Sequence, residues 1–306
     1  MRMDPSMTLL EEYRKSLKMA EVEEVIDLAL NRPIAFGLVR LIYRLPITPN
    51  QITFLSLVSG LVAAYYLSLG LFALGGIWYA LANLLDCMDG QLARLQHSGT
   101  PLGRLVDGVV DWIISVAVFT GLGIGMASLA GTAGVWYLVV AGGLTSAFHA
   151  IVFDYYQQEY LSAVRGEENF LTREVTKSQG EFARLQAEGG QPFRKIVLFL
   201  YLQYLRVQHR SQLKKSPSRQ YPPDLFRQYN RGILRWWTFL GATTNRSMLI
   251  VAGILGQPEV FLWVVVVPAN LYLVAMVLWQ RRIQRALDDA LHHQLEHQSK
   301  EVGVGL

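Results

Sequence analysis

Four aspartates in the stretch 86–111 have types and spacings that suit a metal site. Asp86 and Asp89 are three residues apart, and Asp107 and Asp111 are four apart. Both side chains of each pair therefore project from one face of a helix. The flanking segments are apolar, and acidic side chains in membrane spans are costly and usually functional. Carboxylate oxygens are preferred by hard cations, and two such ions could clamp a pyrophosphate.

Small and basic residues accompany these aspartates. Gly90 and Ala93 have small side chains, so a ligand can approach that face of the helix closely. Gly103 has the same effect on the opposite helix. Arg94 places a cation near the headgroup level, where it suits a phosphate. Taken alone, the small residues are equally typical of helix packing in membranes, and Arg94 of a charge anchored at the membrane surface.

The composition places these residues in a membrane. The chain is 52% hydrophobic and 17% charged, whereas a soluble domain has about 25% charged residues. Lys and Arg are absent from 45–93, 105–164 and 247–280, and a transmembrane helix needs roughly 20 apolar residues. The charged N-terminal segment does not resemble a cleavable signal peptide. Because the basic residues flank apolar stretches, the pI near 9.1 favours lipid headgroups over nucleic acid as partners.

We expect an all-α integral membrane protein with six transmembrane helices and an N-terminal amphipathic helix at the membrane surface. The spans are predicted at 52–71, 73–94, 103–125, 135–156, 236–255 and 260–280. This layout divides the chain into N-terminal helices, four spans with the aspartates, a basic insertion, two spans and a tail, at 1–50, 51–156, 157–235, 236–280 and 281–306.

The N-terminal part carries two predicted helices. Residues 1–31 read as one charged helix, and 34–45 as an amphipathic helix that lies in the interface. Asn50 or Thr53 is predicted to cap the first span. A short apolar run at 196–204 is predicted to rest on the membrane surface or on the protein, because it is too short to span.

Charge sets the orientation. The insertion carries 14 Lys or Arg against 7 Asp or Glu. In the six-span layout it shares one membrane face with the other loop and tail arginines, Arg40, Arg44, Arg94, Arg104, Arg281 and Arg282. The opposite turns carry no Lys or Arg. The positive-inside rule therefore assigns both termini and the aspartates to the cytoplasm, and we expect a bacterial or archaeal inner membrane.

The stretch resembles the CDP-alcohol phosphotransferases of class I. Their pattern is D-x2-D-G-x2-A-R-x8-G-x3-D-x3-D, and every fixed position is filled, by Asp86, Asp89, Gly90, Ala93, Arg94, Gly103, Asp107 and Asp111. The resemblance extends to Pro49 and Asn50 and to the six-span layout. It does not cover residues 1–31, and 157–235 looks like an elaboration.

The resemblance implies a role for each motif residue. The four aspartates would hold two Mg²⁺ or Mn²⁺ ions, and Asp111 would also be the general base. The CDP site would be lined by Gly90, Ala93, Arg94, Gly103 and Asn50. The acceptor alcohol would attack the β-phosphate and CMP would leave. Members of this family are commonly homodimers.

The acceptor is left open. Arg246 and His149 are candidate contacts, although a buried arginine can equally pair with a protein carboxylate and a buried histidine can simply pack. The family includes phosphatidyl transfer from CDP-diacylglycerol to a small alcohol, transfer from CDP-choline or CDP-ethanolamine to diacylglycerol, and synthesis of soluble inositol phosphodiesters. We expect phosphatidyl transfer to a small polyol or its phosphate.

Two other classes fit less well. UbiA-type prenyltransferases place two Asp-rich motifs on distant helices, whereas here both pairs belong to one hairpin. A divalent-cation transporter would need acidic or polar groups along a path across the membrane, whereas these aspartates lie at one end of their spans.

Overall fold

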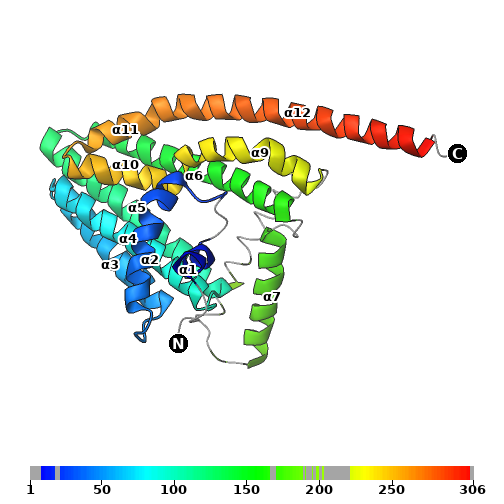
Figure 1. The fold of residues 1–306 in the computed structure, drawn as a ribbon. Helices are drawn as coiled ribbons and strands as arrows, with labels where there is room; N and C mark the ends of the chain where they lie inside the picture. The colour runs from blue at the N-terminus through cyan, green and yellow to red at the C-terminus, as the bar shows by residue number, and fades with distance from the viewer. Residues whose placement is uncertain are drawn as a thin grey trace. The chain divides into compact units, whose positions relative to one another are not determined.

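The computed structural model describes residues 8–17, 21–165, 170–188 and 221–303, with 190, 195, 198, 199 and 202. Every element in these ranges is helical (Figure 1). The α-helices are α1 Leu9–Ser16, α2 Arg32–Ile42, α3 Pro49–Ser68, α4 Phe72–Leu95, α5 Pro101–Ala130, α6 Val135–Arg165, α7 Phe170–Glu188, α9 Pro223–Trp237, α10 Ala242–Ile254, α11 Pro258–Val266 and α12 Pro268–Gly303. A π-helical turn, η1 Asp27–Asn31, precedes α2, and a 3₁₀ turn, Thr238–Leu240, precedes α10.

The chain forms two compact units. The first consists of Met1–Ile151 and Thr238–Asn270, and the second of Val152–Trp237 and Leu271–Leu306. In the first unit α3 packs along both α4 and α5, and α10 packs along α4. These units group the chain differently from the topological segments, whose boundaries stay a prediction.

Glycines let α3 and α5 approach closely. A Cβ atom added to Gly121 would lie 2.2 Å from the carbonyl oxygen of Ala64, and one added to Gly125 would lie 2.0 Å from that of Leu67. Leu67 and Leu122 are buried in the surrounding core. Small residues at such interfaces allow the close backbone contact that holds membrane helices together.

We therefore expect Gly125→Ala to lower the unfolding temperature of the detergent-solubilised protein, because overpacking costs about 1–3 kcal/mol. Gly108→Ala on the same helix is the matched control, since a Cβ atom there meets nothing within 4 Å. Thermal melts followed by circular dichroism compare the two variants. Equal melting temperatures for both would contradict the close packing of α3 and α5.

In the described part of the chain, four stretches of helix are long and apolar enough to cross a membrane. They are Pro49–Ser68, Val106–Ala130, Val135–Val164 and Pro258–Gln294. Large apolar side chains point outward from these helices, with Phe54 62%, Trp112 73% and Leu144 68% exposed. A water-soluble protein rarely exposes so much apolar surface, so the chain has the character of an integral membrane protein.

Two of the six predicted spans are not confirmed. Helix α4 carries Asp86, Asp89 and Arg94, which lower its mean hydropathy. The predicted helix at 236–255 is interrupted by the turn Thr238–Leu240. The remaining α10 has 13 residues and is therefore about 20 Å long, against a hydrocarbon core of about 30 Å.

The prediction of one charged helix over residues 1–31 is wrong for the described residues. Thr8 and Glu11 form a capping box at the start of α1, and Leu17 ends the helix in extended conformation. The chain then turns and buries acidic residues. The buried Glu24 carboxylate accepts hydrogen bonds from the backbone N–H groups of Thr243, at 3.0 Å, and Thr244, at 2.8 Å. A continuous charged surface helix could not bring this side chain into the core.

The start of the first span is also corrected. Thr48, rather than Asn50 or Thr53, is the cap of α3, and it forms a capping box with Gln51. Helix α2 buries Ala35, Phe36 and Val39. Its position at the membrane surface stays a prediction, and the run 196–204 lies largely outside the described residues.

Candidate metal centre

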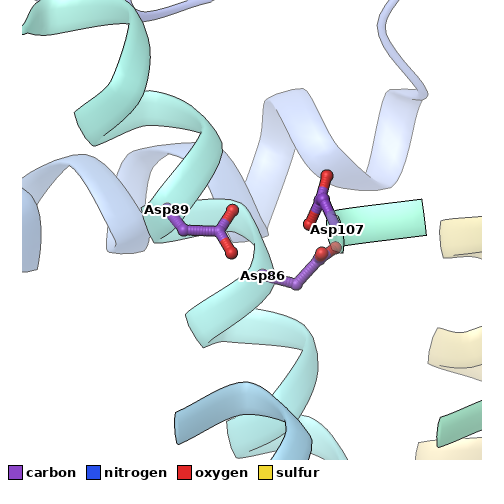
Figure 2. A group of neighbouring side chains, drawn as sticks. All are labelled: Asp86, Asp89 and Asp107. Carbon is purple, nitrogen blue, oxygen red and sulfur yellow. The ribbon is translucent and has the colours of Figure 1, made fainter. Parts of the chain in front are cut away.

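Three aspartates converge where α4 and α5 meet. Asp86 and Asp89 come from α4 and Asp107 comes from α5, and Figure 2 shows their carboxylates turned toward a common space. One oxygen of each carboxylate lies within 4.8 Å of the others. Asp89 is only 4% exposed. Such a group is of the right type and spacing to hold a cation.

The turn between the two helices brings these residues together. His97 has a left-handed backbone conformation with φ of 51°, which reverses the chain just after α4. Thr100 then caps α5, because its hydroxyl accepts a hydrogen bond from the N–H of Gly103 at 3.0 Å. Asn50 lies beside this cap, since a Cβ atom on Gly103 would be 3.9 Å from its Oδ1.

A residue of α3 orients the most buried carboxylate. The Thr53 hydroxyl donates a hydrogen bond to Oδ2 of Asp89 at 2.6 Å. Groups that bond to a metal-binding carboxylate fix its direction and tune its strength as a ligand. The sequence suggested only a helix cap at Thr53, because nothing in its spacing indicates a partner on α4.

Asp111, the fourth aspartate of the motif, forms an ion pair with an arginine. Its Oδ1 lies 2.8 Å from Nη2 of Arg246 on α10, and Nη1 of the same guanidinium lies 3.2 Å from Oδ2 of Asp86. Arg246 therefore bridges Asp86 and Asp111. A protein carboxylate was one of the two partners that the sequence left open for this arginine.

The residues fit a divalent cation. Three carboxylates within 4.8 Å repel one another unless a proton or a cation lies between them. Arg246 forms an ion pair with Asp86 and so relieves part of this repulsion. An all-oxygen set of this kind suits Mg²⁺ or Mn²⁺, and Asp86, Asp89 and Asp107 are the residues that would hold the ion.

Arg94 contacts the N-terminal segment. Its Nε donates a short hydrogen bond to the backbone oxygen of Ser16, at the end of α1. Its Nη2 is buried and has no hydrogen-bond partner among the described residues. Gly90 lies against the same guanidinium, since a Cβ atom there would be 3.4 Å from both Nη atoms. Arg94 therefore retains a free donor beside a glycine, as a phosphate or nucleotide contact requires.

A buried arginine of α2 forms hydrogen bonds with α4. Arg32 pairs with Glu23 at 3.2 Å, and its Nη1 donates to the backbone oxygen of Cys87 at 3.5 Å. Gln91 in turn donates to the backbone oxygen of Arg32 at 3.1 Å. Spacing does not predict this support, because Glu23 and Arg32 lie far before the motif at 86–111 in the sequence.

His149 contacts a different partner. This fully buried residue of α6 has its Nε2 3.3 Å from Oδ1 of Asn270. Asn270 also donates to the backbone oxygen of Val266 at 2.8 Å. Both residues of this contact belong to the first unit, and the contact involves no aspartate.

Comparisons with known proteins agree with the motif. Residues 46–168 match the profile of a family described as CDP-alcohol phosphatidyltransferase. The chain is 33% identical over 104 residues to a bifunctional IPC transferase and DIPP synthase of Rubrobacter xylanophilus, covering 34% of this chain and 23% of that protein. It is 27% identical over 173 residues to a phosphatidylinositol phosphate synthase of Mycobacteroides abscessus, covering 55% and 66%.

An archaeal protein is similar over a shorter stretch. The archaetidylinositol phosphate synthase of Pyrococcus horikoshii is 33% identical over 81 residues, which cover 26% of this chain and 43% of that protein. The alignments thus span less than two thirds of each of these relatives.

Proposed function

We propose that this chain, whose residues 46–168 form a CDP-alcohol phosphatidyltransferase domain, transfers a phosphatidyl group from a CDP-alcohol such as CDP-diacylglycerol to a small alcohol and releases CMP. The observation that carries this proposal is the convergence of Asp86, Asp89 and Asp107 inside that domain. Phosphoryl transfer depends mainly on positioning and on neutralising charge, and this site offers both.

The residues of the site have different roles in the proposed reaction. Asp86, Asp89 and Asp107 hold divalent cations, which when bound neutralise the donor's pyrophosphate and stabilise charge during transfer. We expect two ions, with Asp111 as a further ligand once it parts from Arg246. Gly90, Ala93, Arg94, Gly103 and Asn50 line the donor site.

Asp111 takes the proton of the acceptor hydroxyl. The hydroxyl oxygen forms a bond to the β-phosphorus, and the bond from that phosphorus to the bridging oxygen breaks. CMP leaves with the electron pair of the broken bond. Asp111 lies one helical turn beyond Asp107, so it can reach a hydroxyl that approaches from the far side of the bound donor.

The acceptor is best matched by a phosphorylated polyol. Two of the compared proteins are named phosphatidylinositol phosphate synthase and archaetidylinositol phosphate synthase. Contact of Arg246 and His149 with the acceptor stays a prediction, and the ion pairs of Arg246 favour a role in positioning Asp86 and Asp111. The name IPC transferase and DIPP synthase supports a second candidate, synthesis of an inositol phosphodiester.

An assay that pairs each CDP donor with each acceptor alcohol tests the proposal. The purified enzyme is incubated with Mg²⁺ or Mn²⁺ and with CDP-diacylglycerol, CDP-choline, CDP-ethanolamine or CDP-inositol. Each donor is paired with inositol phosphate, glycerol phosphate, serine or diacylglycerol, and mass spectrometry detects products and CMP. A phosphatidyl product with inositol phosphate or glycerol phosphate supports the proposal. A product only with CDP-inositol favours the second candidate, and no CMP from any pair contradicts both.

We further propose six membrane spans, with both termini and the aspartates in the cytoplasm of a bacterial or archaeal cell, and a homodimer as the assembly. Helix α5 has 30 residues and is about 45 Å long, enough to cross a bilayer. Its ends should therefore lie on opposite sides.

Single cysteines at Ser98 and Ala130 test this topology in a Cys87→Ala background. We expect a membrane-impermeant maleimide added outside intact cells to label the Ala130 position and not the Ser98 position. Both positions are exposed, so both should react after the membrane is permeabilised. Labelling of both from one side would contradict the topology.

A further inference from the structure

A small aromatic pocket lies in the second unit and shares no residue with the aspartate site. It is formed by parts of α6, α9 and α12, and its aromatic walls are Tyr156, Tyr160, Phe226 and Trp237. The rings of Tyr156 and Trp237 are stacked with centroids 4.4 Å apart. The pocket has about 230 Å³ of empty space, which includes open solvent, and has room for a group about the size of one water molecule.

The amide side chains and the indole N–H of the pocket are already engaged with one another. Trp237 Nε1 donates to Oε1 of Gln280 at 3.0 Å, and Gln280 Nε2 donates to Oδ1 of Asn230 at 2.8 Å. Asn230 in turn donates to the backbone oxygen of Phe226 at 3.1 Å. This chain of hydrogen bonds fixes the wall and leaves little capacity for a neutral polar ligand.

Glu159 is a polar side chain of the pocket that takes no part in this chain of hydrogen bonds. It lines the pocket and is partly buried. In the described part of the chain it has neither a hydrogen bond nor an ion pair. A carboxylate that leaves water without a partner is costly unless a cation joins it. The pocket therefore combines an unmatched negative charge with a wall of aromatic side chains, a residue type that attracts cations.

We propose that this pocket binds a primary ammonium group, with Glu159 as its counter-ion and the aromatic side chains of the pocket wall around it. Size selects the ligand, because an ammonium group is close to a water molecule in size whereas a trimethylammonium group is larger. Glu159 lies near the end of the candidate span Val135–Val164, and Tyr and Trp gather where membrane meets water. Lipid headgroups carry ammonium groups at that level, and a soluble amine carries the same group.

Lipid retention in nanodiscs distinguishes these sources. The protein is placed in nanodiscs of phosphatidylcholine and phosphatidylethanolamine in equal amounts, and native mass spectrometry counts the lipids that remain bound after release. We expect the wild type to retain phosphatidylethanolamine at least several-fold over phosphatidylcholine, and Glu159→Gln to lose that preference. Asp224→Asn, which removes an exposed carboxylate of α9, is the control and should retain it.

A second arm uses ethylammonium chloride as the soluble probe, with tetramethylammonium chloride as the size control, in calorimetric titrations in detergent. Glu159-dependent binding of ethylammonium without a lipid preference would assign the pocket to a soluble amine. Binding of neither ethylammonium nor phosphatidylethanolamine, or equal binding by wild type and Glu159→Gln, would overturn the proposal. Thermal melts without ligand test whether the Glu159→Gln variant is folded. We expect its melting temperature to be no lower than that of the wild type, because the substitution removes an unmatched charge.

Discussion

Asp107→Asn is expected to reduce CMP release by at least about 100-fold while the protein keeps its fold. Even residues that only support a metal ligand cost roughly 10–100-fold when mutated, and Asp107 contributes one of the three converging carboxylates. Its amide replacement has the same size and removes one negative charge. The measurement compares initial rates of CMP release at saturating Mg²⁺, together with Mn²⁺ binding followed by electron paramagnetic resonance.

The control is Glu259→Gln, which neutralises an exposed carboxylate at the start of α11. It should keep both the rate and the Mn²⁺ affinity of the wild type. Asp107→Asn should lose both and melt at a temperature close to that of the wild type. An Asp107→Asn protein with full activity, or with unchanged Mn²⁺ binding, would refute a metal centre at this position.

Asp111→Asn should separate catalysis from donor binding. A positioned base typically contributes roughly 10²–10⁴-fold, so turnover should fall by about that factor. Asp86, Asp89 and Asp107 remain to hold metal and pyrophosphate, so we expect much of the metal-dependent affinity for the CDP donor to persist. Asp86→Asn should lose donor affinity as well as turnover. If both variants lose donor binding to the same extent, Asp111 is a ligand alone and the assignment of the base fails.

Arg246 offers the control for an indirect effect. In Asp111→Asn its guanidinium loses the ion pair at 2.8 Å and keeps only Asp86 as a partner, so it could disturb the site by moving. The double variant Asp111→Asn with Arg246→Gln removes that guanidinium. We expect the double variant to remain as slow as Asp111→Asn, and recovery of turnover would mean that the displaced arginine caused the defect.

The convergence of three aspartates follows from local sequence. Asp86 and Asp89 share one face of a helix, and a short capped turn returns the chain so that Asp107 meets them. Both conditions depend on residues close together in the chain. They are therefore visible in spacing alone, and so is the all-helical, apolar character of the chain.

Other features depend on contacts between distant segments. Glu24 meets Thr243 and Thr244, and Arg246 meets Asp86 and Asp111, across gaps of more than a hundred residues. Spacing carries no information about such pairs. The contacts of Glu24 explain why the described residues 21–31 turn inward rather than continuing a surface helix.

The most direct measurement is whether CMP and a phosphatidyl product form together under control of a divalent cation. The purified wild type is incubated with CDP-diacylglycerol and inositol phosphate after treatment with EDTA, and again after excess Mg²⁺ is restored. We predict no product in EDTA, and equal amounts of CMP and phosphatidylinositol phosphate once Mg²⁺ returns, with neither from Asp107→Asn. Product formation in EDTA, or CMP release without transfer to any acceptor, would contradict the proposed metal-dependent transfer.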